Sequence, residues 1–385
     1  MRRPLLVLIG LVGMLALACA GGKGDEELER ASPTTAEEPS GPAGVPMFRG
    51  NPAHTGENPG PGVERSPKLL WRFQTGAEVS SSPAVVDGVV YIGSSDSNVY
   101  ALDAATGEER WRFQTGGWVL SSPAVVAGGV YIGSYDTYVY ALDAATGEER
   151  WRFETGNSIV SSPAVVSGLV YIGSKDHSVY ALDAATGEER WHLETDGVVY
   201  SSPAVVDGVV YIASSDCYVY ALDAATGEEH WRFQAGLYGK SSAAVVDGVV
   251  YIASVDTYVY ALDATTGEQR WRFQTGGMVL SSPAVADGVV YIGSDDSHVY
   301  ALDADTGEER WRFETGGSVF SSPAVVEGVL YIGSNDNYVY ALDAATGEER
   351  WRFDAGDAVM SSPAVVGGVV YIGSRDGYVY AITEG

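Results

Sequence analysis

The sequence predicts an all-β fold, an eight-bladed β-propeller whose four-stranded antiparallel blades repeat every 40 residues. Three observations predict it. The residues between regularly spaced tryptophans recur almost letter for letter, no helical periodicity competes, and each unit of about 40 residues holds four short β-rich runs, as a propeller blade does. The eight tryptophans, each 40 residues from the next, are Trp71, Trp111, Trp151, Trp191, Trp231, Trp271, Trp311 and Trp351.

One unit, which begins at Ser81, shows how the four strands are predicted. Asp87-Gly88 is a two-residue hairpin turn of the kind that needs positive φ. Two further turns, at 95–98 and 104–107, separate the other runs of β-branched and aromatic residues. The predicted strands are 83–86, 89–94, 99–103 and 109–114.

Closure of the ring follows from counting strands. Sets of strands one to three begin at Ser81 and at every fortieth residue up to Ser361, but the chain ends at Gly385 before an eighth fourth strand. The segment Leu69–Gln74 matches the fourth-strand pattern and has no blade of its own. We therefore predict that this N-terminal strand pairs with the last blade, so that 68–385 form one monomeric propeller preceded by a lead-in at 46–67.

The first 45 residues carry targeting signals. Arg2 and Arg3 precede an apolar stretch from Leu5 to Leu17, which predicts a signal peptide over 1–18. The sequence up to Cys19 resembles the bacterial lipobox, in which the cysteine receives a diacylglyceryl group; secretion without an anchor is the alternative. Residues 19–45 are rich in Gly, Pro and acids and predict a flexible, lipid-anchored linker. We expect an exported protein anchored in the cell envelope.

Composition excludes two classes of protein. The formal net charge of −28 makes a polyanionic nucleic acid a poor partner. Two cysteines in 385 residues exclude a small disulfide-stapled fold, and 45% hydrophobic residues are enough to fill a large core.

The repeated motif Ala101-x-Asp103-x-x-Thr106-Gly107-x-x-x-Trp111 resembles the tryptophan-docking motif of propellers of the pyrroloquinoline-quinone (PQQ) type. The segment 46–56 resembles the lead-in of the same family. The resemblance implies that each motif tryptophan packs against the neighbouring blade, while the Asp and the Thr-Gly turn form hydrogen bonds across the junction. It assigns structural roles to Asp103, Thr106, Gly107, Trp111, Trp151, Trp191, Trp231, Trp271, Trp311 and Trp351.

The same resemblance implies a function. The family includes a lipid-anchored, eight-bladed scaffold subunit that docks on the outer-membrane β-barrel assembly machinery. A non-catalytic envelope scaffold on the periplasmic face of the outer membrane is therefore expected here, with that machinery as the candidate partner. Two alternatives remain open: a propeller that binds a small molecule such as PQQ or a glycan, and a PQQ-dependent dehydrogenase.

No pattern in the sequence predicts a catalytic or metal site. Every recurring carboxylate appears seven or eight times, whereas a catalytic site needs unlike residues at one point. The aspartates at Asp96 and its repeats are interpreted as turn formers. The five histidines fall at unrelated repeat positions, and Cys217 is a lone thiol. We predict that the protein is not an enzyme and has no cofactor.

Candidate partner-binding residues come from the positions that vary. In a four-stranded meander, the connections between blades and the turns between strands two and three share one face, and nearly all individual residues fall there. Aromatic residues and Met at exposed loops are typical of interfaces; burial inside the central funnel is the alternative for Leu120, Leu280 and Phe320. The predicted partner-binding residues are Trp118, Leu120, Tyr200, Tyr238, Lys240, Leu280, Phe320 and Met360.

The lipobox hypothesis predicts the effect of Cys19→Ser. Only the thiol can accept the diacylglyceryl group, so the variant should lose incorporation of a labelled fatty acid and leave the membrane fraction. Metabolic labelling followed by fractionation measures both. Equal label on the wild type and the variant would reject Cys19 as the lipidation site.

Overall fold

The computed structural model describes residues 44–236 and 240–385, which belong to the compact unit 42–385. The predicted signal peptide, Cys19 and Tyr238 lie outside the described residues. All regular structure in the described part is β-strand, and it contains no helix of the length and apolar character needed to cross a membrane.

The repeats form the predicted strands. The innermost strands are β3 (Ala84–Val86), β7 (Ala124–Val126), β11 (Ala164–Val166), β15 (Ala204–Val206), β19 (Ala244–Val246), β23 (Ala284–Ala286), β27 (Ala324–Val326) and β31 (Ala364–Val366). The second strands are β4 (Val89–Gly93), β8 (Gly129–Gly133), β12 (Leu169–Gly173), β16 (Val209–Ala213), β20 (Val249–Ala253), β24 (Val289–Gly293), β28 (Val329–Gly333) and β32 (Val369–Gly373).

The third strands are β5 (Asn98–Asp103), β9 (Tyr138–Asp143), β13 (Ser178–Asp183), β17 (Tyr218–Asp223), β21 (Tyr258–Asp263), β25 (His298–Asp303), β29 (Tyr338–Asp343) and β33 (Tyr378–Glu384). The outermost strands are β6 (Glu109–Gln114), β10 (Glu149–Glu154), β14 (Glu189–Glu194), β18 (Glu229–Gln234), β22 (Gln269–Gln274), β26 (Glu309–Glu314), β30 (Glu349–Asp354) and β2 (Pro67–Gln74). The predicted bounds are met within two residues. The hairpin turn has the expected positive φ, 49° at Asp87 and 73° at Gly88.

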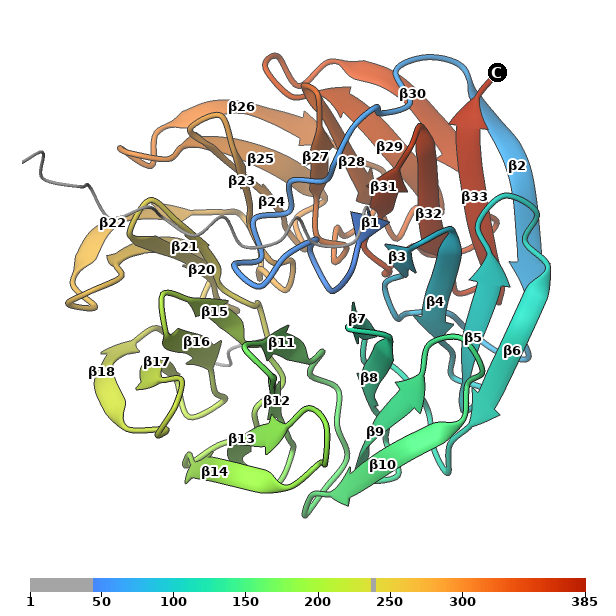
Figure 1. Ribbon diagram of the computed structural model, residues 1–385. Coiled ribbons are helices and arrows are strands. Elements are labelled where there is room, and N and C mark those ends of the chain that lie inside the picture. Colours follow the sequence, from blue (N-terminus) through green and yellow to red (C-terminus); the bar gives the residue numbers. More distant parts are fainter. Residues whose placement is uncertain (1–43, 237–239) are drawn as a thin grey trace, which may run out of the picture. The chain divides into compact units, whose positions relative to one another are not determined.

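Eight sheets surround a central channel, which confirms the predicted eight-bladed propeller (Figure 1). Seven blades use four consecutive strands. The eighth has the order β2-β33-β32-β31, in which Trp71 pairs with Ala381 and Gln74 with Tyr378. The N-terminal strand therefore closes the ring as predicted, and β2 lies beside the C-terminal strand in Figure 1.

A cycle of serine hydrogen bonds joins the blades near the channel. The backbone N–H of Ser82 donates to the hydroxyl oxygen of Ser122, and the same bond repeats from blade to blade until Ser362 donates back to Ser82. All eight bonds measure 2.8 to 3.0 Å. Because the cycle has no free end, every blade contributes to the position of its neighbours.

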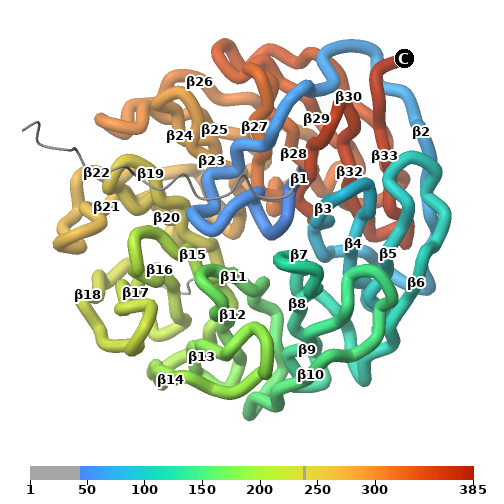
Figure 2. Tube along the Cα trace, viewed as in Figure 1, coloured from blue at the N-terminus to red at the C-terminus, as the bar shows by residue number. Residues whose placement is uncertain are grey.

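The lead-in segment fills the channel. Strand β1 (Gly44–Val45) pairs with the inner edge of β3, and Val45 is buried. These two residues therefore belong to the propeller and not to the linker, which was predicted to extend to residue 45. The following residues cross the centre of the ring, drawn in blue in Figure 2. Their carbonyls accept hydrogen bonds from equivalent valines of five inner strands, β7, β15, β19, β23 and β27, at Val125, Val205, Val245, Val285 and Val325.

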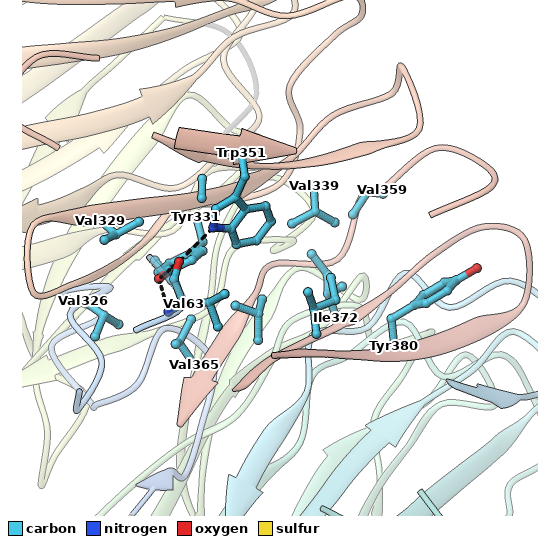
Figure 3. Close-up of a cluster of buried hydrophobic side chains, with 14 of the residues drawn as sticks. Val63, Val326, Val329, Tyr331, Val339, Trp351, Val359, Val365, Ile372 and Tyr380 are labelled. Carbon is cyan, nitrogen blue, oxygen red and sulfur yellow. Dashed lines mark hydrogen bonds between the residues drawn. The ribbon is translucent and has the colours of Figure 1, made fainter. Parts of the chain in front are cut away.

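The lead-in also completes the last blade junction (Figure 3). The eighth blade is built from both chain ends and lacks the turn between its third and fourth strands. The Val63 carbonyl takes the place of that turn, because it accepts hydrogen bonds from Trp351 Nε1 at 2.8 Å and from the Tyr331 hydroxyl at 3.0 Å. Tyr331 and Val63 are fully buried.

Two buried basic residues lie in the lead-in. Arg49 donates to the carbonyls of His54, Ser282 and Pro283, and burial lowers its pKa to about 9. The His54 ring packs edge-on against Phe48, and its two nitrogens have no hydrogen-bond partner among the described residues. Burial, and then the Arg49 charge, lower the pKa of His54 to about 3.

Graded truncation should separate the roles of the N-terminal segments. A chain that begins at residue 44 should melt like the parent. A chain that begins at residue 64 loses the channel filling and the Val63 acceptor and should melt lower. A chain that begins at residue 75 also loses β2, which leaves an unpaired edge on β33, and should aggregate. Thermal melting and size-exclusion chromatography measure these outcomes; a monomeric, undestabilised chain from residue 75 would refute closure by β2.

His54 should make stability depend on pH. Its pKa is lower in the folded state than in the unfolded state, so protonation favours unfolding, and stability should fall as the pH drops from about 6.5 towards 3. The slope should reach roughly 1.4 kcal/mol per pH unit for one proton. His54→Phe should remove that part of the slope, while the half-exposed control His192→Gln should keep it. Denaturant melts at several pH values test this; an unchanged slope in His54→Phe would contradict it.

Candidate interaction face

The propeller has two faces of different character. The docking-turn face holds the turns after strands one and three of each blade, residues 87–88 and 104–108 and their repeats. The connection face holds the turns at 94–97, the blade-to-blade connections at 115–123, and their repeats.

The docking-turn face is formed by one joint repeated at every junction. Trp111 Nε1 and the Tyr91 hydroxyl donate to the same carbonyl, that of Ala144 in the next blade, at 3.0 and 3.1 Å. A Cβ on Gly147 would lie 2.7 Å from the Trp111 ring, so only glycine fits there. Equivalent indole bonds at all eight junctions measure 2.8 to 3.0 Å.

The motif aspartate acts within its own turn, not across the junction as the family resemblance implied. Asp103 Oδ1 accepts from the backbone N–H groups of Ala105 and Thr106 and from the Thr106 hydroxyl. Arg110 Nη2 lies 2.7 Å from Asp103 Oδ2, and this contact, with the Thr106 N–H, lowers the pKa of Asp103 to about 2. The aspartate shapes the turn, and the turn presents the Ala104 carbonyl to the tryptophan of the preceding blade.

Shallow grooves of about 430 to 580 Å³ lie between blades on the docking-turn face. Three of them are lined by the same repeat positions, including Tyr171, Tyr211 and Tyr371. Because these grooves repeat with the blades, this face offers no single distinctive docking position.

On the connection face, the turn aspartates tie loops together. Asp136 Oδ1 accepts from the Tyr138 N–H, while Oδ2 accepts from the Tyr140 hydroxyl and from the N–H of Gly116 in the preceding connection. The local bond is the one expected of a turn former, and the bond to Gly116 was not foreseen. In the described part of the chain, no three His, Cys, Asp or Glu side chains converge as metal ligands would.

Six of the eight predicted partner-binding residues form a series at one repeat position, two residues before the serines of the cycle. All six are partly or fully exposed. Leu120, Leu280 and Phe320, for which burial in the central funnel was the alternative, are therefore not fully buried. The six residues are Leu120, Tyr200, Lys240, Leu280, Phe320 and Met360.

Trp118, the ninth tryptophan of the chain, is the most exposed large apolar side chain of the described residues, at 55%. Its ring lies 5.5 Å from that of Tyr135 in the turn of the next blade. Sequence reasoning missed Met278, which is 44% exposed at the same repeat position; aligning the units would have found it.

A cavity of about 500 Å³ opens beside Trp118. Its polar groups include Arg375 and Glu78, which form a two-pronged ion pair of 2.9 and 3.0 Å. The lining residues are Ala77, Glu78, Ser80, Ser95, Trp118, Leu120, Met360 and Arg375. This is a distinctive apolar hollow, because Trp118, Leu120 and Met360 differ from their counterparts in most other blades.

The sequence and the fold are similar to those of known proteins. A family model described as outer membrane protein assembly factor BamB matches residues 63–162, 135–253, 218–322 and 295–385. No curated protein matches the sequence.

Among solved structures, BamB from Moraxella catarrhalis is 20% identical, with 83% of this chain and 100% of that chain covered and a TM-score of 0.74. A europium-containing methanol dehydrogenase is 16% identical over 89% and 98% of the two chains, with a TM-score of 0.78. The quinohemoprotein alcohol dehydrogenase from Comamonas testosteroni is 19% identical over 88% and 80%, with a TM-score of 0.77. These three likenesses concern the fold. The family match spans most of the sequence, and the chain belongs to the family described as outer membrane protein assembly factor BamB.

Proposed function

We propose that this protein is a non-catalytic scaffold of the cell envelope that binds a protein partner through its connection face. The observation that carries the proposal is the contrast between the two faces. The docking-turn face repeats one joint, whereas the connection face holds exposed Trp118 beside a distinctive apolar cavity. An exposed aromatic residue next to an apolar hollow is typical of a protein-binding hot spot.

Family membership supports the location and the partner. The matching model is described as an outer-membrane protein assembly factor. We propose that the protein is exported, that it is monomeric, and that a lipid on Cys19 anchors it to the periplasmic face of the outer membrane. Its candidate partner is the outer-membrane β-barrel assembly machinery.

The residues of this propeller do not fit a quinone cofactor. Residues of the lead-in cross the channel and bond to the inner strands, which closes the axis over which quinone dehydrogenases hold PQQ. The described residues include a single cysteine, Cys217, so they offer no vicinal pair for the quinone. In the cavity beside Trp118, the Arg375 and Glu78 charges are satisfied by each other. We therefore propose that the protein acts without a cofactor, and that protein binding is favoured over binding of PQQ or a glycan.

Variants on the two faces test the proposal. Trp118→Ala combined with Leu120→Ala should leave the melting temperature nearly unchanged and weaken partner capture by about 2 kcal/mol or more, as truncation of aromatic hot spots does. The control changes Glu108, Glu148 and Glu188 to Lys on the docking-turn face and should keep the partners.

Capture is measured by cross-linking in the envelope, followed by affinity purification and mass spectrometry, after both variants are shown to be folded. Loss of partners in the Glu-to-Lys variant of the docking-turn face, with full retention in the Trp118 and Leu120 double variant, would assign binding to the docking-turn face and contradict the proposal. Turnover of alcohols by protein reconstituted with PQQ and Ca²⁺ would overturn the non-catalytic proposal.

A further inference from the structure

A line of aromatic rings and ammonium groups crosses the connection face from the connection before β7 to the connection before β19. We call it the lysine ladder; it consists of Trp118, Tyr135, Lys175, Tyr200 and Lys240. The Trp118 and Tyr135 rings are in tilted contact, with their planes at 47°, and Lys175 Nζ lies 4.9 Å from the Tyr135 ring centre and 6.0 Å from that of Tyr200. Lys240 Nζ lies 5.3 Å from the Tyr200 ring centre. Four successive contacts thus connect residues from several different loops.

The charges of the ladder are exceptional for this chain. The protein carries 51 acidic residues and only four lysines, Lys23, Lys68, Lys175 and Lys240, and two of them belong to the ladder. Arginines of the repeated motif are paired with aspartates, as Arg110 is with Asp103. Among the described residues, arginine and histidine form all the ion pairs and neither ladder lysine forms one. The two ammonium groups are therefore available to an anionic ligand.

The rings hold the lysines in place for such a ligand. An ammonium group near an aromatic face is attracted by its quadrupole, and Lys175 is held between two such faces. This restricts a long side chain before binding, which reduces the entropy lost when a carboxylate approaches. At the equivalent repeat position the other cation is Arg375, and it is already paired with Glu78, whereas Asp295 and Asn335 carry no positive charge.

Size and polarity indicate what kind of anion fits. The ladder begins at Trp118, which also lines the apolar cavity of about 500 Å³ with Leu120 and Met360. A ligand that uses both features needs one large apolar group for the cavity and negative charges spread over the two lysines farther along. An extended acidic peptide segment has this combination, and its charge is complementary to the ladder while the rest of the acidic surface repels it.

From these contacts we propose that the lysine ladder is the docking site for an extended, acidic segment of the protein partner, anchored by one large apolar side chain in the cavity beside Trp118. The proposal rests on the proposed scaffold function and names the chemistry of the partner. Lys175 and Lys240 supply charge and orientation, and Trp118 supplies the apolar contact.

Fluorescence anisotropy with a defined probe tests the proposal. The probe is a short labelled peptide with one phenylalanine followed by several glutamates in a Gly-Ser background; one control peptide replaces Glu by Lys and another replaces Phe by Gly. The full chain should bind the first peptide, each control should bind at least about tenfold more weakly, and added salt should weaken binding.

Matched variants locate the site on the protein. Lys175→Gln with Lys240→Gln should weaken peptide binding at least about tenfold, Lys175→Arg should retain it, and Lys68→Gln, which removes the same charge from β2, should have no effect. Trp118→Ala should weaken binding, whereas Met278→Ala, at the same repeat position on another blade, should not. Equal affinity for all lysine variants would overturn the proposal.

The outcomes separate this inference from the scaffold function. Suppose that the Trp118→Ala, Leu120→Ala variant loses the envelope partners, while the double lysine variant keeps the partners and no longer binds the peptide. The scaffold function is then supported, and docking of an acidic segment on the lysines is refuted. If the ladder binds vesicles of anionic phospholipid and not the peptide, the ligand is a lipid surface and the proposal fails. If no connection-face variant affects partner capture, the scaffold function itself fails.

Discussion

Ring closure is the constraint on which the rest of this structure depends. A four-stranded blade buries its faces only against its two neighbours, so a single open junction would expose apolar faces on both sides. The closing contact is the same everywhere: one backbone carbonyl accepts a tryptophan N–H and a tyrosine hydroxyl from the preceding blade. Near the channel, the cycle of serine bonds runs through all eight blades without a free end. A net contribution of about 1 kcal/mol for each such hydrogen bond makes these cycles a major part of the stability.

This constraint explains where function can reside. The residues of the joint, such as Trp111, Gly147 and the turn that Asp103 shapes, are required at each junction and are repeated almost without change. The connection face is also joined from blade to blade, by the turn aspartates and by the serine cycle, but the side chains of Trp118, Leu120 and Lys175 take no part in those hydrogen bonds. Side chains at these positions can differ from blade to blade without opening a junction. Exposed Trp118, the cavity beside it and the lysine ladder all belong to these free positions.

The lead-in supplies hydrogen-bond acceptors at two places where the repeated blades have none, the inner strands and the last junction. The inner strands present unpaired N–H groups to the channel, and the carbonyls that follow Val45 accept several of them. The last junction lacks its docking turn because the two chain ends meet there, and Val63 supplies the missing acceptor.

The sequence by itself determined the blade number, the strands, the hairpin turns and closure by β2, because these follow from the repeat period and from local turn chemistry such as Asp87-Gly88. It also located the variable face. Only the tertiary structure decided that the motif aspartate bonds within its turn, that Val63 completes the last junction, and that Trp118, Tyr135, Lys175, Tyr200 and Lys240 are in contact. The physical reason is separation along the chain. Val63 and Trp351 are 288 residues apart and no periodicity relates them, so their contact exists only once the ring brings them together. In the ladder, Tyr135 and Lys175 occupy equivalent repeat positions, as do Tyr200 and Lys240, but equivalence in the repeat does not show that the side chains touch.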